Sequence, residues 1–446
     1  MNIILTDTKP KYIQIFNYIS MLINKNILKP NDKLPSKRNL ALELNISLNT
    51  IIQAYNLLLD EGYIYTIEKK GYFVCEQPSI TLPIKSLKNN EIIQNDLYYD
   101  LTTSNVEKFY NINFKKIAKE IIDSDTYLNK TNQTGDLNLK KAIKKHLFEN
   151  RGIITNTQNI IIGSGIEMLE QILSLISINN ITLENPGYHK LASIAQNINK
   201  TINYINLDDQ GVKIPPKQTI LYTTPFNQFP TGIKMSISRK KELLNFALNT
   251  NSFIIEDDFD AEFRINSAPT TSLWMLNNDN VIFFSTFSTT MFPGLRISYV
   301  IIPDSLVTKY NQKYNNYSTS VSTLTQACLA KFIENGYYAS HINKLKRNYL
   351  KKRNLCIEIL KPYSKLISYD AYSNYLSLLI KINKDIDEMD LISRLKKKKI
   401  LIQSLQMLDV YKHQNNTLIL GYTAIGLKDI PIALNILINE ILNYEK

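Results

Sequence analysis

The stretch SKRNLALELNISLNTIIQAY, residues 36–55, decides how the N-terminal part of this chain folds. Ser36 and Ser47 each precede a run of apolar residues at helical spacing. Serine is a preferred N-cap because its hydroxyl accepts a hydrogen bond from the first helical turn. Only two residues separate the end of the first run, near Leu44, from Ser47. The spacing therefore predicts two short helices joined by a tight turn, a helix-turn-helix.

The second of these helices, expected from Ser47 to about Glu61, has two different faces. Its apolar face carries Ile51, Ala54, Leu57 and Leu58. Its polar face carries Asn49, Thr50 and Gln53. A helix of this kind packs one face against its domain and leaves the other available to a partner.

The flanking segments complete a compact unit over residues 1–75. An amphipathic helix is expected around Tyr12 to Asn26, because apolar residues recur there at helical spacing. The segment IYTIEKKGYFVC, residues 64–75, alternates in strand fashion and predicts a β-hairpin. The tip of this hairpin carries Lys69, Lys70 and Gly71. A helix, a helix-turn-helix and a basic hairpin in this order predict a winged helix.

The composition excludes several classes of protein. The chain has 446 residues, 44% of them hydrophobic, and single cores stop growing at roughly 250–300 residues, so we expect more than one domain. No run approaches the ~18 apolar residues of a membrane span, and the first residues lack a signal pattern. The three cysteines show no disulfide or metal-ligand spacing, so we expect a cytoplasmic protein without a metal site. The formal net charge of +12 fits a nucleic-acid partner, although lysine is abundant throughout.

The remainder of the chain has a different pattern. Residues 76–96 mix Pro, Ser and Asn without a sustained period and are expected to form a linker. From residue 97 to residue 446, helical segments alternate with short β-rich runs such as TILYTT (219–224), SFIIEDD (252–258) and VIFFST (281–286). This alternation is typical of an α/β domain with a largely parallel sheet.

The polar groups of the predicted winged helix suit a DNA duplex. The amide and hydroxyl groups of Asn49, Thr50 and Gln53 can pair with base edges in the major groove. The turn and the wing supply the other candidate DNA-binding residues, most of them for phosphate contacts: Ser36, Lys37, Arg38, Ser47, Lys69, Lys70 and Gly71. The alternative is that the polar face is merely solvated and that these lysines are ordinary surface charges.

The N-terminal features resemble the GntR family of winged-helix regulators. The resemblance runs through YIQIFNYI (12–19), LPSKRNLALELNISLNTIIQAY (34–55), LLLDEGYIY (57–65) and KKGYFV (69–74). One departure is Leu48, where the family usually carries an arginine. A bidentate contact of that arginine with guanine is therefore not expected here.

The remaining sequence resembles fold type I aminotransferases that depend on pyridoxal phosphate, and the whole chain resembles the MocR/GabR subfamily of GntR regulators. The motifs are GSGIEMLEQIL (163–173), LENPGYHK (183–190), TTPFNQFPTG (223–232), IIEDDFDAEFR (254–264), STFSTTMFPGLRISYV (285–300) and QACLAKFIENGYYASHINKLKRNYLKKRN (326–354). The resemblance implies a winged helix-turn-helix domain joined to an α/β aminotransferase-like domain over residues 97–446. It also implies a homodimer that binds a double-stranded DNA operator.

A cofactor site follows from the same resemblance. Asp257 matches the carboxylate that pairs with the protonated pyridine nitrogen of the cofactor. Ser164 and Gly165, in a turn that opens a predicted helix, could receive the phosphate on backbone N–H groups, and Arg296 is a candidate phosphate partner. The family's aromatic positions near the cofactor correspond to Tyr188 and Phe259.

Four departures from the family pattern concern this pocket. Thr289 stands where the family carries the lysine that binds the cofactor covalently, and Thr290 follows it. A threonine hydroxyl supplies neither an imine nor a general base, so we expect no transaminase activity and no covalently attached pyridoxal phosphate. Phe259 lacks the hydroxyl of the family's tyrosine, Asn227 replaces a frequent histidine, and Ile419 replaces the arginine that holds a substrate carboxylate.

Alternatives remain open at this point. The pocket either senses a small-molecule effector, such as noncovalently bound pyridoxal phosphate or another anion, or serves only as a dimerisation scaffold. An aminotransferase that carries a DNA-binding head is the competing function, and a nonspecific nucleoid-type binder is a third. A basic stripe, expected to be a solvated helix face or an auxiliary DNA contact, comprises Lys344, Lys346, Arg347, Lys351, Lys352 and Arg353.

Overall fold

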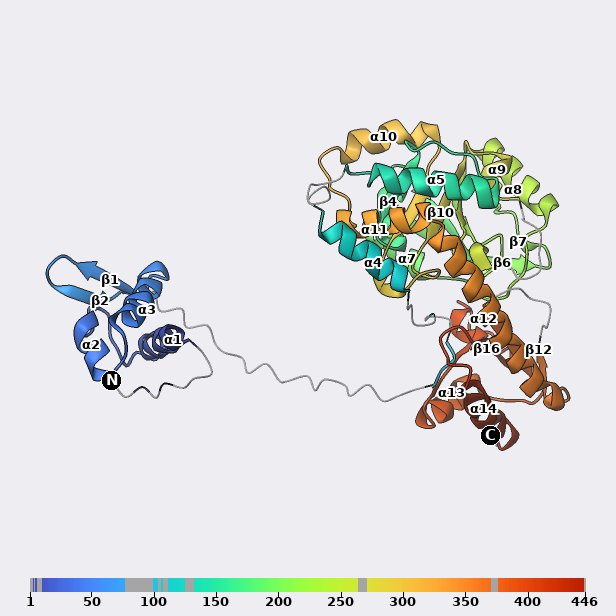
Figure 1. Ribbon diagram of the computed structural model, residues 1–446. Helices are drawn as coiled ribbons and strands as arrows, with labels where there is room; N and C mark the ends of the chain where they lie inside the picture. The colour runs from blue at the N-terminus through green and yellow to red at the C-terminus, as the bar shows by residue number, and fades with distance from the viewer. Residues whose placement is uncertain are drawn as a thin grey trace. The chain divides into compact units, whose positions relative to one another are not determined.

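The computed structural model describes residues 3, 5, 10–76, 99–102, 106, 111–124, 132–263, 271–369 and 376–444. The chain divides into two compact units, Met1–Gln94 and Asn95–Lys446 (Figure 1). The expected linker at 76–96 lies outside the described residues, except for Glu76. None of the described helices is both long and apolar enough to cross a membrane.

The N-terminal unit is the predicted winged helix. Its elements are α1 (Lys11–Asn24), α2 (Lys37–Glu43), α3 (Leu48–Asp60), β1 (Ile64–Ile67) and β2 (Gly71–Val74). Ser36 and Ser47 are the N-caps of α2 and α3, and each hydroxyl accepts a hydrogen bond from the backbone N–H three residues ahead. One apolar cluster joins the three helices and both strands, and α3 lies at its centre because it packs against α1, α2 and β1.

The wing is an antiparallel hairpin in which Ile64 faces Val74 and Ile67 faces Gly71. The chain reverses over three residues, and Lys69 has a φ of 61° while Gly71 has a φ of 119°. Only glycine adopts the second of these conformations without strain, which explains a glycine at the start of β2. Lys33 pairs with Phe73 and extends this small sheet by one bridge.

The larger unit contains an eight-stranded sheet with the order β4-β11-β10-β9-β8-β5-β6-β7. Its strands are β4 (Ile160–Gly163), β5 (Asn180–Asn185), β6 (Thr201–Asp208), β7 (Gly211–Val212), β8 (Ile220–Thr223), β9 (Phe253–Asp257), β10 (Val281–Thr286) and β11 (Ser298–Ile301). The neighbours from β10 through β6 are parallel, whereas β11, β4 and β7 pair antiparallel. The expected α/β domain with a largely parallel sheet is confirmed.

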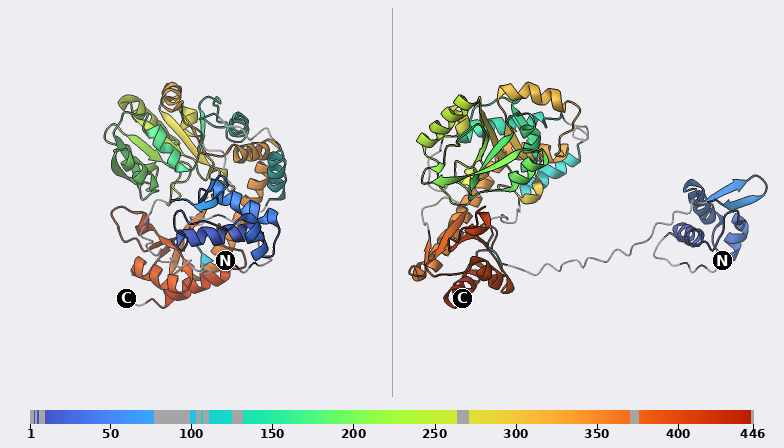
Figure 2. Two further views of the ribbon diagram at one scale, coloured as in Figure 1. Left: turned by 90° about the vertical axis from the view of Figure 1, so that its left-hand side faces the viewer. Right: turned by 180° about the vertical axis from the view of Figure 1, so that it is seen from behind.

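Helices cover both faces of this sheet (Figure 2). Along β10, Ile282 and Phe284 point to one apolar cluster, and Val281 and Phe283 point to another. The first cluster lies under α6 (Leu169–Leu173), α7 (Lys190–Asn197) and α10 (Asp304–Tyr314). The second lies under α4 (Ile112–Ile122), α5 (Leu137–Arg151), α8 (Ile237–Thr250), α9 (Leu273–Leu276), α11 (Thr323–Glu334) and α12 (Tyr337–Leu360). A sheet buried on both faces explains the continuous apolar runs of its strands.

The larger unit also contains a second sheet. The sequence pattern, which predicts one α/β domain up to residue 446, does not predict this sheet. It is antiparallel and has the order β12-β13-β16-β15. Its elements and neighbours are β12 (Ile367–Tyr369), β13 (Ser377–Ile382), β15 (Gln403–Ser404), β16 (Thr417–Gly421), α13 (Glu388–Lys397), α14 (Ile430–Leu442) and a short pair of β3 (Tyr99–Asp100) with β14 (Ile400–Leu401). Antiparallel strands with helices on one side make this part α+β.

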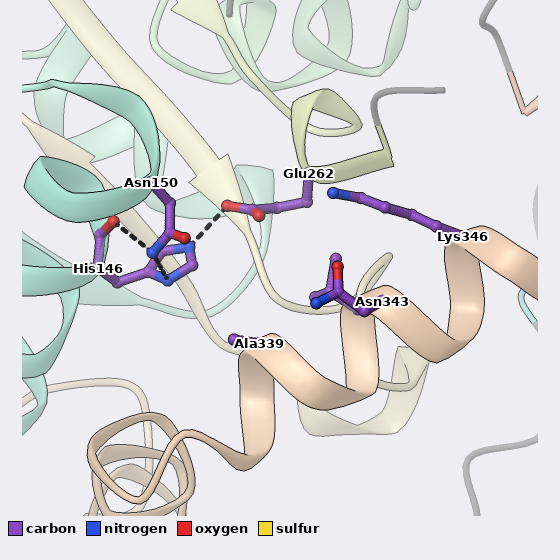
Figure 3. A pocket seen from close by; sticks show the side chains of 7 residues that line it. His146, Asn150, Glu262, Ala339, Asn343 and Lys346 are labelled. Atoms are coloured by element: carbon purple, nitrogen blue, oxygen red, sulfur yellow. Dashed lines mark hydrogen bonds and ion pairs between the residues drawn. The ribbon is translucent and has the colours of Figure 1, made fainter. Parts of the chain in front are cut away.

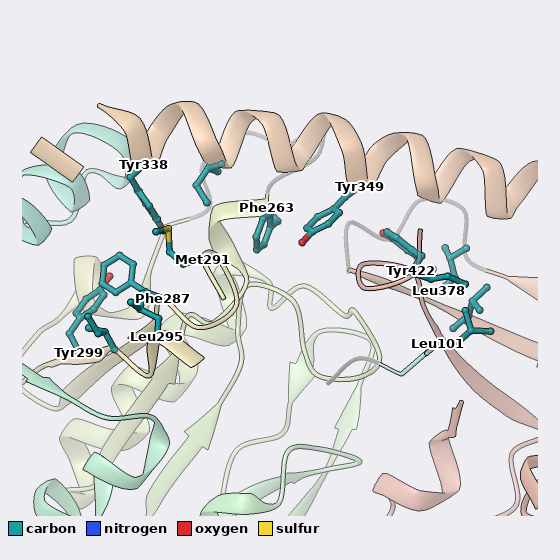
Figure 4. Close-up of a cluster of buried hydrophobic side chains, with 14 of the residues drawn as sticks. Leu101, Phe263, Phe287, Met291, Leu295, Tyr299, Tyr338, Tyr349, Leu378 and Tyr422 are labelled. Carbon is teal, nitrogen blue, oxygen red and sulfur yellow. The ribbon is translucent and has the colours of Figure 1, made fainter. Parts of the chain in front are cut away.

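Helix α12 connects the two sheets of the larger unit (Figure 4). Near its start, the Tyr338 hydroxyl donates a hydrogen bond to Thr290 Oγ1 at 3.1 Å. Further along, the Tyr349 ring packs on Phe263, and Lys352 Nζ donates to the carbonyl oxygen of Thr423 at 2.8 Å. The expected basic stripe is therefore interrupted, because Lys352 and Arg353 are buried while the other four cations lie on accessible positions.

Candidate functional site

Helix α3 presents the polar face that the sequence predicts. Asn49 and Gln53 are exposed and Thr50 is half-buried. The opposite face supplies the core with Ile51, Ala54, Tyr55 and Leu58. The expected apolar face needs one correction: Leu57 is only half-buried, and Tyr55 is fully buried with its hydroxyl donating to the carbonyl oxygen of Pro35 at 2.9 Å. A buried tyrosine needs such a partner, and this one ties α3 to the segment before α2.

The start of α3 is held by its own side chains. Ser47 Oγ accepts from the Thr50 N–H at 3.2 Å and lies 2.8 Å from Thr50 Oγ1. Ser36 Oγ accepts in the same way from the Asn39 N–H. Both serines therefore have a structural role as caps, independent of any contact with DNA. The amides of Asn49 and Gln53 remain the clearest candidates for contacts with bases.

The candidate phosphate-binding cations of this unit lie on α2 and on the wing. Lys37 Nζ lies 4.9 Å from the centre of the Tyr72 ring, so this cation packs across the wing strand β2. Arg38 is exposed, and so are Lys69 and Lys70 at the tip of the hairpin. Cations on α2 and on the wing can contact phosphates on both sides of a groove that receives α3.

The larger unit has a pocket of about 380 Å³ at the carboxyl ends of its parallel strands. The pocket is lined by Tyr188 after β5, Thr224 after β8, Asp257 at the end of β9 and Thr286 at the end of β10. Ligands of open α/β sheets bind at this edge, where loops leave successive strands. The lining also includes residues from the segments around the second sheet: Leu376, Gln403, Leu408 and Thr423.

Asp257 is the buried acid of this pocket. Its Oδ2 accepts a hydrogen bond from the Tyr222 hydroxyl, and among the described residues no donor reaches its Oδ1. Burial raises the pKa of Asp257 to about 7, assisted by the charge of Asp258 and opposed by the hydrogen bond from Tyr222. An unsatisfied buried carboxylate oxygen is costly, so this atom suits a ligand that brings a proton or a positive charge.

Thr289 lines the pocket but its hydroxyl is already engaged. Thr289 Oγ1 donates to the carbonyl oxygen of Phe259 at 2.8 Å. The Phe259 ring lines the same pocket and packs edge-on against Phe229, which in turn contacts Tyr188. The pocket thus has aromatic walls, and at position 289 it offers a hydroxyl in place of an amine.

Arg296 forms an ion pair that the sequence did not indicate. Its guanidinium donates to Glu167 at 2.9 Å, and Glu167 also accepts from Lys190 at 2.5 Å. Gly165 has a φ of 66°, and a Cβ at this position would lie 2.2 Å from the Arg296 guanidinium. Glu167 and Lys190 both lie within the family motifs, but no local pattern in the sequence predicts their pairing with Arg296.

Three further expectations about the pocket need adjustment. The expected helix after the GSG turn is a 3-10 turn, Ile166–Met168, followed by the five-residue α6. Ser164 does not line the pocket, and its N–H donates to Ser320 Oγ at 3.1 Å. Asn227 donates to Asp260 at 2.9 Å, and Ile419 is fully buried in β16; neither lines the pocket.

A second cavity of about 280 Å³ lies between α5, the turn at Glu262 and α12 (Figure 3). His146 Nε2 lies 2.8 Å from Glu262 Oε1, and Lys346 extends toward the same carboxylate. Burial would raise the pKa of Glu262, but the charges of His146 and its other basic neighbours lower it to about 2. The cavity shares no lining residue with the larger pocket, and His146 also lies 3.1 Å from the side-chain nitrogen of Asn150.

The residues of the larger pocket fit pyridoxal phosphate in part. Asp257 Oδ1 can accept from a protonated ring nitrogen, the aromatic walls suit a flat ring, and Arg296 with Lys190 can pair with a phosphate. Phe259 offers no hydroxyl, and Thr289 offers no amine. The arrangement therefore suits noncovalent binding of this cofactor. Across the described ranges, no group of His, Cys, Asp and Glu gathers in a way that could hold a metal ion.

Both units of the chain match known protein families. Residues 98–415 match the family model of aminotransferase class I and II, and residues 11–74 match the model of bacterial regulatory proteins of the gntR family. Among solved structures, a multiple substrate aminotransferase from Thermococcus profundus has a TM-score of 0.69 at 23% identity and covers 78% of this chain and 92% of its own. At this identity the likeness concerns the fold.

Relatives in sequence extend over both units. The HTH-type transcriptional regulator YdeL of Bacillus subtilis is 32% identical over 438 residues, which is 94% of each chain. A protein of Rhizobium meliloti named as probable rhizopine catabolism regulatory protein MocR is 23% identical and covers 98% of this chain and 94% of its own. The HTH-type pyridoxine biosynthesis transcriptional regulator PdxR of Corynebacterium glutamicum is 26% identical over 78% of each. The chain therefore belongs to the MocR-type subfamily of GntR regulators, in which a winged helix-turn-helix is joined to a fold type I aminotransferase domain.

Proposed function

We propose that this chain is a transcription regulator that reads DNA with α3 and binds a phosphorylated effector, noncovalently, in its aminotransferase-like domain. The observation that carries the DNA-reading part is the division of α3 into two faces. Ile51 and Leu58 are fully buried, whereas Asn49 and Gln53 are exposed on the first turns of the helix. Amide side chains at this end of a recognition helix can pair bidentately with adenine in the major groove.

Phosphate contacts complete the proposed DNA interface. We assign them to Lys37, Arg38, Lys69 and Lys70, with Ser36 and Ser47 at the helix starts and Gly71 at the wing. These contacts fix the position of α3 and carry the salt dependence without reading sequence directly. Asn49, Thr50 and Gln53 are assigned to the bases, and part of the hydrogen-bonding capacity of Thr50 is used by its bond to Ser47.

For the larger domain we propose ligand binding without transamination. The hydroxyl of Thr289 bonds to the backbone of Phe259, and it offers no amine to the cofactor. Support for pyridoxal phosphate as the ligand comes from Asp257, Arg296 and the aromatic walls, and from the name of the relative PdxR, a regulator of pyridoxine biosynthesis. When bound, the group would supply a charged ring nitrogen and a phosphate as handles for recognition.

The assembly follows from the family to which the chain belongs. We propose a cytoplasmic homodimer in which two winged helices contact two half-sites of an operator, so that the spacing of the half-sites mirrors the dimer. We propose the following domain boundaries: the winged helix spans residues 1–75, the linker spans residues 76–96, and the aminotransferase-like domain spans residues 97–446. The match of residues 11–74 to the gntR family supports the first of these limits.

A DNA shift assay with selected operator sequences and a random duplex tests the reader. Arg38→Ala should weaken binding to every sequence and reduce the slope of log affinity against log salt by about 1. Gln53→Ala should weaken binding to the selected site by roughly fivefold to a hundredfold and change base preference at one position. Lys144→Ala, an exposed change on α5, and Asn56→Ala, further along α3, are the matched controls.

Unchanged binding by both the Arg38 and the Gln53 variants would show that α3 and its flanks are not the DNA reader. A wild-type protein that selects no preferred sequence from random DNA would favour a nonspecific nucleoid-type binder. Thermal unfolding with added pyridoxal phosphate tests the pocket separately, because a ligand that binds the native state raises its stability.

A further inference from the structure

Both cations of the large pocket are paired with the same carboxylate. Lys190 and Arg296 are the positively charged side chains in the described lining of the pocket. Lys190 Nζ donates to Glu167 Oε1 at 2.5 Å, and Arg296 Nη2 donates to Glu167 Oε2 at 2.9 Å. Glu167 itself is not part of the lining, so its carboxylate bridges two groups that face the ligand space.

Gly165 shows how closely this bridge lies against the pocket wall. A Cβ on Gly165 would lie 2.2 Å from Arg296 Nη2 and 2.3 Å from Glu167 Oε2. Gly165 and Ile166 line the pocket, so the ion pair sits directly beside the ligand space. The Glu167 carboxylate therefore lies next to the backbone of the GSG turn, at the wall of the pocket.

The ion pairs between Glu167 and its two cations are accessible enough for the cations to exchange Glu167 for another anion. The side chains of Lys190, Glu167 and Arg296 are 44%, 46% and 48% exposed. Ion pairs exposed to this extent contribute little to stability, so their rupture costs little. Burial would raise the pKa of Glu167, but the hydrogen bond from Lys190 and the charge of Arg296 lower it, so the carboxylate is charged at neutral pH.

We propose that the Glu167 carboxylate occupies the binding site of the ligand's phosphate, and that a phosphomonoester binds by replacing Glu167 as the partner of Lys190 and Arg296. This inference rests on the proposed function, in which the pocket binds a phosphorylated ring noncovalently. A phosphate carries up to two negative charges and three acceptor oxygens, whereas a carboxylate carries one charge. The phosphate therefore outcompetes Glu167, and a ring without phosphate leaves the bridge closed. Glu167 is in this sense a specificity residue, which sets a threshold of charge that a ligand must exceed.

Titration calorimetry on the full-length chain tests this with pyridoxamine 5′-phosphate, pyridoxamine and inorganic phosphate as probes. The first two differ only in the phosphate, and neither has an aldehyde that reacts with lysines. Glu167→Gln should bind pyridoxamine 5′-phosphate roughly fivefold to tenfold more tightly than wild type, because the competing charge is gone. Its affinity for pyridoxamine should stay within about twofold of wild type. Lys190→Gln should bind the phosphorylated probe about fivefold more weakly than wild type.

Glu170→Gln is the matched control, since it removes the same charge from an exposed position three residues further along. A gain in affinity by Glu170→Gln equal to that of Glu167→Gln would attribute the effect to net charge and overturn the proposal. An equal gain for pyridoxamine, or no gain for the phosphorylated probe, would overturn it as well.

Inorganic phosphate separates this inference from the proposed function. If wild type and Glu167→Gln both fail to bind pyridoxamine 5′-phosphate, the proposed effector is wrong. Tighter binding of inorganic phosphate by Glu167→Gln than by wild type would then still support a phosphate-binding site occupied by Glu167. If neither protein binds inorganic phosphate either, the proposed phosphate-binding site is refuted.

Discussion

Helix α3 and the large pocket handle their polar groups in opposite ways. On α3, the helix is fixed by caps and by a buried face, while Asn49 and Gln53 are exposed. In the pocket, Thr289 bonds to the backbone of Phe259, and Glu167 bridges Lys190 and Arg296. The proposed DNA-reading surface therefore offers accessible donors and acceptors. In the pocket, several groups are already paired, whereas Asp257 Oδ1 and Ser288 Oγ have no hydrogen-bond partner among the described residues.

The difference bears on how each region achieves specificity. An exposed amide exchanges water for a base edge, so the complementary base gains a hydrogen bond and the wrong base leaves a polar group unpaired. A paired group must first give up its internal partner, so a ligand binds only if it offers more than that partner does. The first mechanism discriminates by geometry and the second by charge.

The largest expected effect comes from placing an amine at position 289. Thr289→Lys, incubated with pyridoxal phosphate and reduced with borohydride, should gain a covalent pyridoxyl group at position 289, whereas wild type should gain none within the pocket. Mass spectrometry of proteolytic peptides locates the adduct. A reduced adduct on Lys190 of wild type would contradict the proposed noncovalent mode, because Lys190 would then bind the cofactor covalently.

Asp257→Asn should separate the stability of the pocket from its affinity. The pKa of Asp257 is raised from 3.8 to about 7 in the folded protein, so the folded state binds this proton more tightly than the unfolded state does. The carboxylate therefore costs stability increasingly as the pH rises from about 4 to about 7. Relative to wild type, Asp257→Asn should gain roughly 2–4 kcal/mol in the free energy of unfolding at pH 8, and much less at pH 5.

Calorimetric unfolding at the two pH values measures this gain, and Asp279→Asn, an exposed change, is the control. The same Asp257 variant should bind pyridoxamine 5′-phosphate more weakly, because a neutral amide cannot pair with a charged ring nitrogen. A stability gain that is equal at pH 5 and pH 8 would mean that the buried charge is not its source.

Ser47 allows the cap of α3 to be separated from its contact with DNA. Ser47→Ala should destabilise the winged helix by about 1 kcal/mol, since it removes the acceptor for the Thr50 N–H. Ser47→Asp keeps a good cap but places a negative charge near the DNA. Hydrogen exchange of the α3 amides in the full-length chain should accelerate in Ser47→Ala and not in Ser47→Asp, whereas DNA binding should weaken in both. Tight DNA binding by Ser47→Asp would place the start of α3 away from the phosphates.

The smallest expected effect concerns the tip of the wing. Lys69→Ala and Lys70→Ala should each lower the salt slope of DNA binding by about 1 if each lysine contacts one phosphate. At physiological salt the loss in affinity should be similar for selected and random duplexes, because phosphate contacts carry no direct sequence information. A change in base preference on substitution of either lysine would instead assign the wing to base reading.

Most of the winged helix could be predicted from the sequence because its determinants are local. Ser36 and Ser47 cap the helices that begin one residue later, and the alternation around Lys69 to Gly71 forms the hairpin. The periodicity places Leu57 in the core, whereas the structure buries Tyr55 and leaves Leu57 half-buried. Local sequence determinants do not predict this difference. Both residues lie near the apolar face, and the choice depends on Pro35, which supplies an acceptor for the tyrosine hydroxyl.

The sequence by itself determined the fold class of both units, the threonine at position 289 and the carboxylate at position 257. These follow from periodicity and from motifs that a single segment contains. Only the tertiary structure decided that the second sheet is antiparallel, that Lys352 and Arg353 are buried, and that Glu167 pairs with a residue 129 positions away. The physical reason is that an ion pair depends on a distance of a few ångströms in space, and separation along the chain does not specify that distance.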